Sequence, residues 1–333
     1  MKKHVIICLA VAVVLLGGAV AVALLMPHDD PAPEKAEEQV VEREEVVEKA
    51  PEVVEEPEEE TPEEEPEDPG EPVTMAEAPA LTSATESGIT VTAPDAFLSS
   101  QQLADVEACI DAIEAGGNTV SVSLTDLSTR RGIWYDTDRL RYPASSIKAA
   151  YCIYLFETRD GAGGKSETVE DCLVNSSNEA YNELAETFGF SPWSAWLKSH
   201  GAPQTATVAA TYTYPDTTAA ELSSVWEEIY RYGTSGEAGS SELAGYLART
   251  NNSPIGAELR DTYEVWSKPG WFPLDDNNIP ATNDAGVVFS DTGTYVLVIM
   301  TDISSDLDAL RPLVRALDAA HETMCGSTIA YYE

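Results

Sequence analysis

The sequence predicts an α/β domain, because its helical and strand patterns come in a mixed order along residues 91–333. Apolar periodicity predicts a helix over Gln101–Ala115 and then the strand pair Thr119–Leu127 and Gly132–Asp136. A helical middle follows. Val265–Gly270 then begins a group of three strands, and a last helix covers Asp306–Met324. About 90 residues precede this domain, and we expect the first 80 of them to contribute nothing to its core.

The N-terminal segment has the pattern of a membrane anchor. Residues 1–4 include two lysines, and Val5–Met26 is an uncharged run of 22 residues. A run of this length can cross a bilayer as a helix and exceeds the apolar part of a usual signal peptide. The positive-inside rule makes residues 1–4 a cytoplasmic tip and places the chain after Pro27 outside. We expect a single-pass protein of the cell membrane with an extracytoplasmic domain; a cleaved signal peptide is the alternative.

An acidic stretch separates this run from the domain. Residues 27–80 carry 22 acidic and 3 basic side chains, in a chain whose formal net charge is −39. Frequent prolines and few apolar side chains leave too little burial to offset the entropy of ordering. We expect a disordered linker over residues 27–90. Valine pairs recur about every seven residues, so a short coiled coil is the alternative.

Charge and cysteine spacing exclude several classes of function. The domain itself is acidic and has no basic patch to neutralise phosphates, which excludes nucleic acid as a partner. No Cys-x-x-Cys or cysteine–histidine spacing indicates zinc, and no loop indicates a nucleotide. We therefore expect no cofactor.

Three short motifs, in one order, carry the chemistry. They are Ser145-Ser146-Ile147-Lys148, Ser176-Ser177-Asn178 and Lys268-Pro269-Gly270. A serine and a lysine three residues apart share one helical face, so the amine can take the proton of the hydroxyl. The same ordered set of motifs is found in active-site-serine β-lactamases and penicillin-binding proteins. Separately, each motif has a plain structural reading: a helix start, a helix N-cap and a turn after a strand.

Residues from about Thr90 to Glu333 resemble the catalytic domain of the class A β-lactamase and penicillin-binding superfamily. Pro143–Lys148 resembles the penicillin-binding form of the first motif. The resemblance implies a three-layer sandwich, an antiparallel sheet flanked by helices, with an all-helical lobe over about residues 142–252. It also implies a serine hydrolase or acyltransferase that acts on D-alanyl-D-alanine-like peptides of peptidoglycan or on β-lactams.

The resemblance assigns a role to each motif residue. Ser145 is the nucleophile, and Lys148 is its base. Ser176 passes a proton to the leaving nitrogen, while Asn178 holds the substrate amide. Lys268 lowers the pKa of the first lysine and attracts a substrate carboxylate.

The third motif departs from the usual lysine-threonine-glycine. Pro269 has neither a hydroxyl for a substrate carboxylate nor an N–H. Gly270 still lets the substrate lie close to the strand. The N–H of Trp271 is expected to be the second oxyanion donor, beside that of Ser145. This departure affects substrate affinity more than acylation.

A second departure concerns deacylation. Class A β-lactamases activate the deacylating water with a glutamate on the omega loop, but Thr187–Pro215 contains no Asp or Glu. The nearest acids, Glu179, Glu183 and Glu186, are expected on a solvated helix face. We therefore expect a penicillin-binding, DD-peptidase-like enzyme. The alternatives are a class A-type β-lactamase and a weak module that binds the cell wall or senses β-lactams.

The resemblance also leads us to expect two disulfides. Four cysteines follow the apolar run, and four allow three pairings. In the resembled fold the first and last helices pack side by side, and some class A enzymes join the nucleophile's helix to the one before the second motif. We expect Cys109–Cys325 and Cys152–Cys172; four buried free thiols are the alternative.

Overall fold

The computed structural model describes residues 72–276 and 279–330. They belong to one of two compact units, Pro66–Glu333. The apolar run Val5–Met26 and the acidic stretch up to residue 71 lie outside the described residues, so the predicted anchor remains a prediction. Within the described ranges, no helix is long and apolar enough to cross a membrane.

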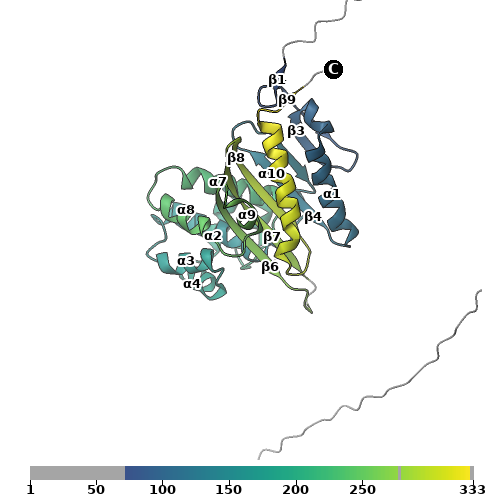
Figure 1. Cartoon of the computed structure of the whole chain (residues 1–333). Helices are drawn as coiled ribbons and strands as arrows, with labels where there is room; N and C mark the ends of the chain where they lie inside the picture. The colour runs from purple at the N-terminus through teal and green to yellow at the C-terminus, as the bar shows by residue number, and fades with distance from the viewer. Residues whose placement is uncertain (1–71, 277–278, 331–333) are drawn as a thin grey trace, which may run out of the picture. The chain divides into compact units, whose positions relative to one another are not determined.

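A seven-stranded antiparallel sheet forms the middle of the domain, in the order β2-β3-β5-β4-β8-β7-β6 (Figure 1). Its strands are β2 (Ala80–Ala84), β3 (Thr90–Pro94), β4 (Val120–Asp126), β5 (Gly132–Tyr135), β6 (Glu264–Phe272), β7 (Ala281–Ser290) and β8 (Gly293–Thr301). The three strands β4, β8 and β7 are buried over most of their length. Such strands are covered on both faces, which is why β8 reads as a continuous apolar run. A small pair, β1 (Val73–Thr74) and β9 (Ile329–Ala330), brings the two ends of the domain together.

Two long helices cover one face of the sheet. In Figure 1, α1 (Gln101–Ala115) and α10 (Arg311–Cys325) lie side by side, and they pack against each other. The apolar positions Leu313, Leu317, Ala320 and Met324 recur every three or four residues along α10 and are buried. This helix therefore closes the core on that face, and the short α9 (Pro254–Leu259) packs against it.

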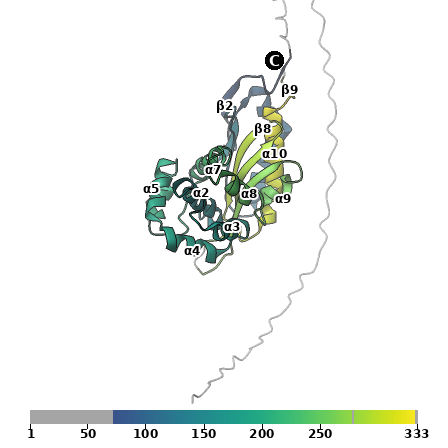
Figure 2. The ribbon, with the colours of Figure 1, turned by 90° about the vertical axis from the view of Figure 1, so that its left-hand side faces the viewer.

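A lobe of helices lies on the other side of the sheet (Figure 2). It comprises α2 (Lys148–Thr158), α3 (Ser166–Val174), α4 (Asn178–Phe188), α5 (Ser191–Ser199), α6 (Pro203–Ala209), α7 (Ala219–Gly233) and α8 (Ser240–Ala248). Residues 148–156 of α2 are all buried, so α2 is the central helix of the lobe. Its N-terminal end contacts the sheet at β6 through the 3₁₀ helix η2 (Ala144–Ile147).

The predicted order of elements is confirmed, as are the antiparallel sheet and its flanking helices. The sheet nevertheless begins earlier than expected. The linker predicted to run to residue 90 gives way to structure before that, since β2 forms a hairpin with β3 in which Thr82 pairs with Thr92. Met75, Ala78 and Ile89 are buried in the core, which gives this stretch the apolar anchors that the acidic segment lacks.

The expected disulfides Cys109–Cys325 and Cys152–Cys172 are not formed, because all four cysteines are free thiols. Cys109 lines a pocket whose α10 residues, Pro312 and Leu313, belong to the first turn of that helix. At about 1.5 Å per residue, Cys325 lies roughly 18 Å further along that helix, which is too far for a disulfide. Helices α2 and α3 do bring Cys152 and Cys172 together, with their Sγ atoms 4.0 Å apart, but as two buried thiols.

Candidate active site

A tight turn presents Ser145 at the start of α2. Both the N–H and the hydroxyl of Ser146 donate to the carbonyl of Pro143, at 3.2 and 2.7 Å. Ala144 has a φ of 46°, which a residue with a side chain adopts only at a cost of about 1–3 kcal/mol. The expected helix therefore begins as the 3₁₀ turn η2. Ser145 is half-buried there.

Lys148 is the first residue of α2 and is completely buried. Its Nζ donates to the backbone carbonyl of Ser176 at 2.6 Å and to Oδ1 of Asn178 at 2.7 Å. The second motif thus lies directly over this amine. The N-cap reading also holds, since the Ser177 hydroxyl accepts the N–H of Ala180 and begins α4.

Lys268 reaches the same point from the sheet. It lies in β6, the edge strand nearest the lobe, and is also completely buried. Its Nζ donates to the hydroxyl of Ser176 at 2.8 Å and to the carbonyl of Pro269 at 3.0 Å. The structure therefore brings one residue of each motif, Lys148, Ser176 and Lys268, to one place.

Both lysines are poised to lose their protons. Burial lowers the pKa of Lys148 to about 8. Burial, and next to it the charge of Lys148, lowers the pKa of Lys268 to about 7. Neither ammonium hydrogen-bonds to a carboxylate among the described residues. Near neutral pH the neutral form is therefore more frequent at Lys268 than at Lys148. A lysine that acts as the base for a serine hydroxyl must be in this neutral form.

Gly270 packs directly on the turn that carries Ser145. A Cβ at this position would lie 2.4 Å from both the carbonyl oxygen of Pro143 and the N of Ser146, and 2.7 Å from the N of Ser145. Only glycine permits this approach. Trp271 follows on the same strand, so the two expected oxyanion donors, the N–H groups of Ser145 and Trp271, come from segments in close contact. Their pairing remains a prediction.

Pro269 is accommodated because β6 is an edge strand. It lies opposite Asp284 of β7 in the sheet register, and proline occurs in sheets at edges, where a missing N–H costs least.

Asp284 is buried and accepts the hydroxyl of Ser253 at 2.6 Å and the N–H of Ile255 at 2.9 Å. Burial raises the pKa of Asp284 to about 6.

An aromatic wall beside Asn178 was not predicted from the sequence. The Tyr214 hydroxyl donates to Oδ1 of Asn178 at 2.9 Å, sharing that acceptor with Lys148. The ring of Tyr214 lies 6.4 Å from that of Tyr142, which in turn meets the ring of Phe272 at 5.8 Å. Tyrosines near a proline in a loop usually pack in a core, so the sequence carried no distinct signal for this contact.

The stretch without acids, Thr187–Pro215, contains α5 and α6. No carboxylate of the described chain hydrogen-bonds to Ser145, Lys148 or Asn178. Glu179, Glu183 and Glu186 are exposed on α4, as expected, and Glu183 pairs with Lys165 at 2.8 Å.

A cleft of about 600 Å³ opens beside Trp271. Three arginines, Arg249, Arg260 and Arg311, line it together with residues 250–254 and 305–308. Arg249 pairs with Glu170 and Arg311 with Glu258. The guanidinium of Arg260 instead bonds to neutral oxygens, and its buried Nε has no partner within the described ranges. The cleft thus offers a cation that no described carboxylate hydrogen-bonds.

Comparison with known proteins finds similarity to one family. Residues 164–320 match the model of the β-lactamase enzyme family; this span includes the second and third motifs but not Ser145 and Lys148. Solved β-lactamases from Streptomyces albus G and Chitinophaga pinensis are similar at 18% and 16% identity, with TM-scores of 0.52 and 0.55. The matches cover 65% and 66% of this chain and 98% and 100% of those chains. No curated protein sequence matches the chain.

Proposed function

We propose that the chain is a serine hydrolase of the β-lactamase and penicillin-binding superfamily, which the match of residues 164–320 to the β-lactamase family model supports. Within that superfamily we propose that it is an extracytoplasmic penicillin-binding enzyme. It forms an acyl-enzyme through Ser145 with D-alanyl-D-alanine-like peptides of peptidoglycan or with β-lactams. The observation that carries this proposal is the meeting of Lys148 and Lys268 around Ser176, with only neutral hydrogen-bond acceptors.

Acylation follows from this arrangement. The Oγ of Ser145 attacks the substrate carbonyl carbon while neutral Lys148 takes the proton of the Ser145 hydroxyl. The negative charge that develops on the carbonyl oxygen is stabilised by the N–H groups of Ser145 and Trp271. The carbon–nitrogen bond then breaks, and the Ser176 hydroxyl gives its proton to the leaving nitrogen. Ser176 recovers a proton from Lys268, which donates to its oxygen at 2.8 Å.

The acyl-enzyme is expected to be long-lived. Its hydrolysis needs a base for water, and a positioned general base typically contributes about 10² to 10⁴ in rate. Because no described carboxylate hydrogen-bonds to Ser145 or Lys148, the lysine itself is the remaining base. This favours a penicillin-binding enzyme over an efficient β-lactamase. The β-lactamase reading stays the second candidate, since the similar solved structures are β-lactamases.

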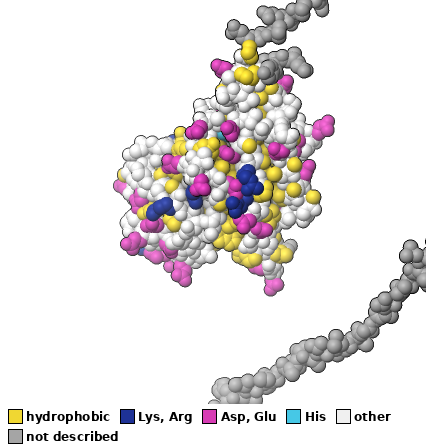
Figure 3. All heavy atoms as spheres, in the orientation of Figure 1, with side chains coloured by type: hydrophobic (Ala, Val, Ile, Leu, Met, Phe, Trp, Pro, Cys, Tyr) yellow, Lys and Arg dark blue, Asp and Glu magenta, His cyan; other side chains and the backbone are white. Residues whose placement is uncertain are grey.

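A substrate with a terminal carboxylate suits the cations at this site. Lys268, beside Ser176, and Arg260, in the cleft beside Trp271, are two cations without a carboxylate hydrogen bond in the described chain. Acidic side chains are spread over the described surface in Figure 3, whereas basic ones form a few small groups.

The enzyme is proposed to act at the outer face of the cell membrane, tethered through Val5–Met26. The acidic stretch that follows would let the domain reach into the cell wall. Fractionation of cells tests this part separately. An enzyme that stays with the membrane only while residues 5–26 are present supports it, and one recovered entirely as a shortened, secreted form contradicts it.

Labelling with penicillin and intact-mass spectrometry tests the chemistry. We expect one adduct per chain, absent in Ser145→Ala and retained in Ser177→Ala, a matched hydroxyl that caps α4. An adduct that survives in Ser145→Ala would overturn the assignment. A chain that never acylates would instead be the wall-binding or sensing module.

Stopped-flow kinetics with a chromogenic cephalosporin separates the two enzymes. A penicillin-binding enzyme gives a burst near one equivalent, followed by a slow steady state, because deacylation limits turnover. Rapid turnover without a burst would indicate a class A-type β-lactamase in which another group is the base for deacylation. Glu179, which directly follows Asn178, is the first candidate for that base.

A further inference from the structure

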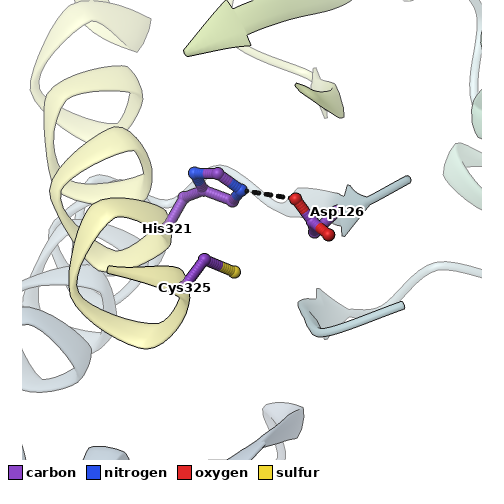
Figure 4. A group of neighbouring side chains, drawn as sticks. All are labelled: Asp126, His321 and Cys325. Atoms are coloured by element: carbon purple, nitrogen blue, oxygen red, sulfur yellow. Dashed lines mark hydrogen bonds and ion pairs between the residues drawn. The ribbon is translucent and has the colours of Figure 1, made fainter. Parts of the chain in front are cut away.

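Three side chains of the types that can bind metals meet between β4 and the end of α10, outside the catalytic motifs. Asp126 ends β4, while His321 and Cys325 lie four residues apart on the last turns of α10 and so share one face. Figure 4 shows the three side chains converging from the strand and the helix. Asp126 Oδ2 lies 3.0 Å from His321 Nε2, and one ligand atom from each of the three lies within 4.8 Å of the other two. All three residues are buried.

Hydrogen bonds already orient these donors. Oδ1 of Asp126 accepts the N–H and the hydroxyl of Thr129, both at 2.7 Å, which turns Oδ2 toward His321. On the other side of the imidazole ring, Nδ1 lies 3.3 Å from the hydroxyl of Thr292. Ligands of protein metal sites are typically held by such outer contacts, which fix the ring and leave its other nitrogen for the metal.

A glycine packs directly against the Asp126 carboxylate. A Cβ at Gly293 would lie 2.4 Å from Asp126 Oδ2 and 3.8 Å from the His321 ring. Gly293 also has a φ of 143°, which side chains rarely allow. The β7–β8 hairpin therefore approaches Asp126 Oδ2 more closely than any other residue type would allow, and this contact helps to hold the donor atom in place.

We propose that Asp126, His321 and Cys325 bind a zinc ion. Imidazole, thiolate and carboxylate are the ligands that zinc takes in proteins, and a thiolate disfavours magnesium and calcium. Ligand atoms at zinc distances stand about 3.3 Å apart, so the Asp126–His321 contact must open by a few tenths of an ångström. Water supplies the fourth ligand, and binding releases the thiol proton. The ion would tie β4 to the end of α10.

A second group, Glu157, His200 and Glu228, has a similar spread of donors. It already holds a cation, because Arg231 pairs with both carboxylates. In the described chain no arginine pairs with Asp126, and the nearby buried Arg131 donates to backbone carbonyls, among them that of Met324. Of the two groups, only that of Asp126 contains a thiol. We did not interpret the His321–Cys325 spacing in the sequence as a sign of zinc, and the third side chain, Asp126, is 195 residues from His321.

Cobalt binding to the full chain tests the site. One equivalent of Co²⁺ is expected to give a thiolate-to-cobalt charge-transfer band, which one equivalent of Zn²⁺ then removes. Cys325→Ser loses the band, whereas Cys109→Ser and His200→Asn keep it. Thr292→Val keeps the band with an affinity lowered about tenfold, as expected for an outer contact. No stoichiometric band in the native chain, or a band that persists in Cys325→Ser, would overturn the proposal.

A measurement on the native chain avoids the risk that a variant misfolds. Zn²⁺ should slow the alkylation of Cys325 by iodoacetamide at least tenfold and leave that of Cys109 unchanged, read by peptide mass spectrometry. Equal rates at Cys325 with and without Zn²⁺ would contradict the site.

Discussion

On the lobe side of the sheet, Lys148 and Lys268 are buried with neutral oxygens as hydrogen-bond partners. On the α10 side, Asp126 is buried against the imidazole of His321 and accepts two further hydrogen bonds from Thr129. Both groups place ionisable side chains out of water, but only in the second does the buried side chain hydrogen-bond to another ionisable side chain.

The pKa shifts follow this difference. Burial holds the pKa of both lysines far below the ordinary value. Burial alone would raise the pKa of Asp126, but its hydrogen bonds to His321 and Thr129 bring it below the ordinary value. The lysines therefore change protonation near neutral pH, which suits proton transfer, while Asp126 stays charged and links two elements. Four predictions test this contrast, in order of expected size.

Lys148→Met should cause the largest loss, lowering the acylation rate constant by about 10² to 10⁴ because the base for Ser145 is removed. The initial affinity for penicillin should change little. Stopped-flow acylation at several penicillin concentrations separates the two quantities. Lys165→Met, a lysine that pairs with Glu183 at the surface, should acylate like the native enzyme. An equal fall in rate and affinity in Lys148→Met would contradict the role.

Asp126→Ala should affect stability and not chemistry. Removing one partner of a buried pair typically costs about 3–5 kcal/mol of unfolding free energy. Urea denaturation measures this loss, and the folded variant should still acylate at the native rate. Asp308→Ala removes an exposed partner of Arg311 and should change stability by less than about 0.5 kcal/mol. A slower acylation in Asp126→Ala would mean that the two groups are coupled.

The sequence predicted what depends on local pattern. The helix Gln101–Ala115 has the predicted bounds, and the three motifs meet as their order implied. It did not predict β2, because most of its residues are exposed at the edge and show no apolar alternation. The Cys109–Cys325 pairing failed for another reason: the axial offset between α1 and α10 is a property of packing. Cys152 and Cys172 do lie together, as the resemblance implied, but as free thiols. Tyr214 and Asp126 likewise find their partners only in the folded chain.

Gly270→Ala should lower the acylation rate by about 10² to 10³, the effect of losing one oxyanion donor. The Cβ of the new alanine would push against the backbone of Ser145 and Ser146 and so displace the turn that carries Ser145. Gly245→Ala is the matched control, because a Cβ in α8 meets nothing within 4 Å and alanine favours the helix. Native acylation in Gly270→Ala would show that the turn tolerates movement and that this close contact does not fix the oxyanion site.

Lys268→Met is the smallest effect and the sharpest test of the contrast, because it should make the folded protein more stable while weakening its affinity for carboxylate ligands. The pKa of Lys268 falls from 10.5 to about 7 on folding, so the folded state binds this proton less tightly than the unfolded chain. The stability of the native enzyme therefore falls as the pH drops from about 10.5 to 7 and is level below that range. Methionine has a similar volume and no charge, so the variant escapes this penalty. Urea denaturation should show a gain of about 1–4 kcal/mol at pH 7 that shrinks toward pH 10. Lys198→Met, an exposed lysine of α5, should show no such trend. If Lys268→Met is instead less stable at every pH, the hydrogen bonds of Lys268 to Ser176 and Pro269 outweigh the cost of burying its charge. The buried lysines would then not destabilise the folded protein, contrary to the contrast drawn with Asp126.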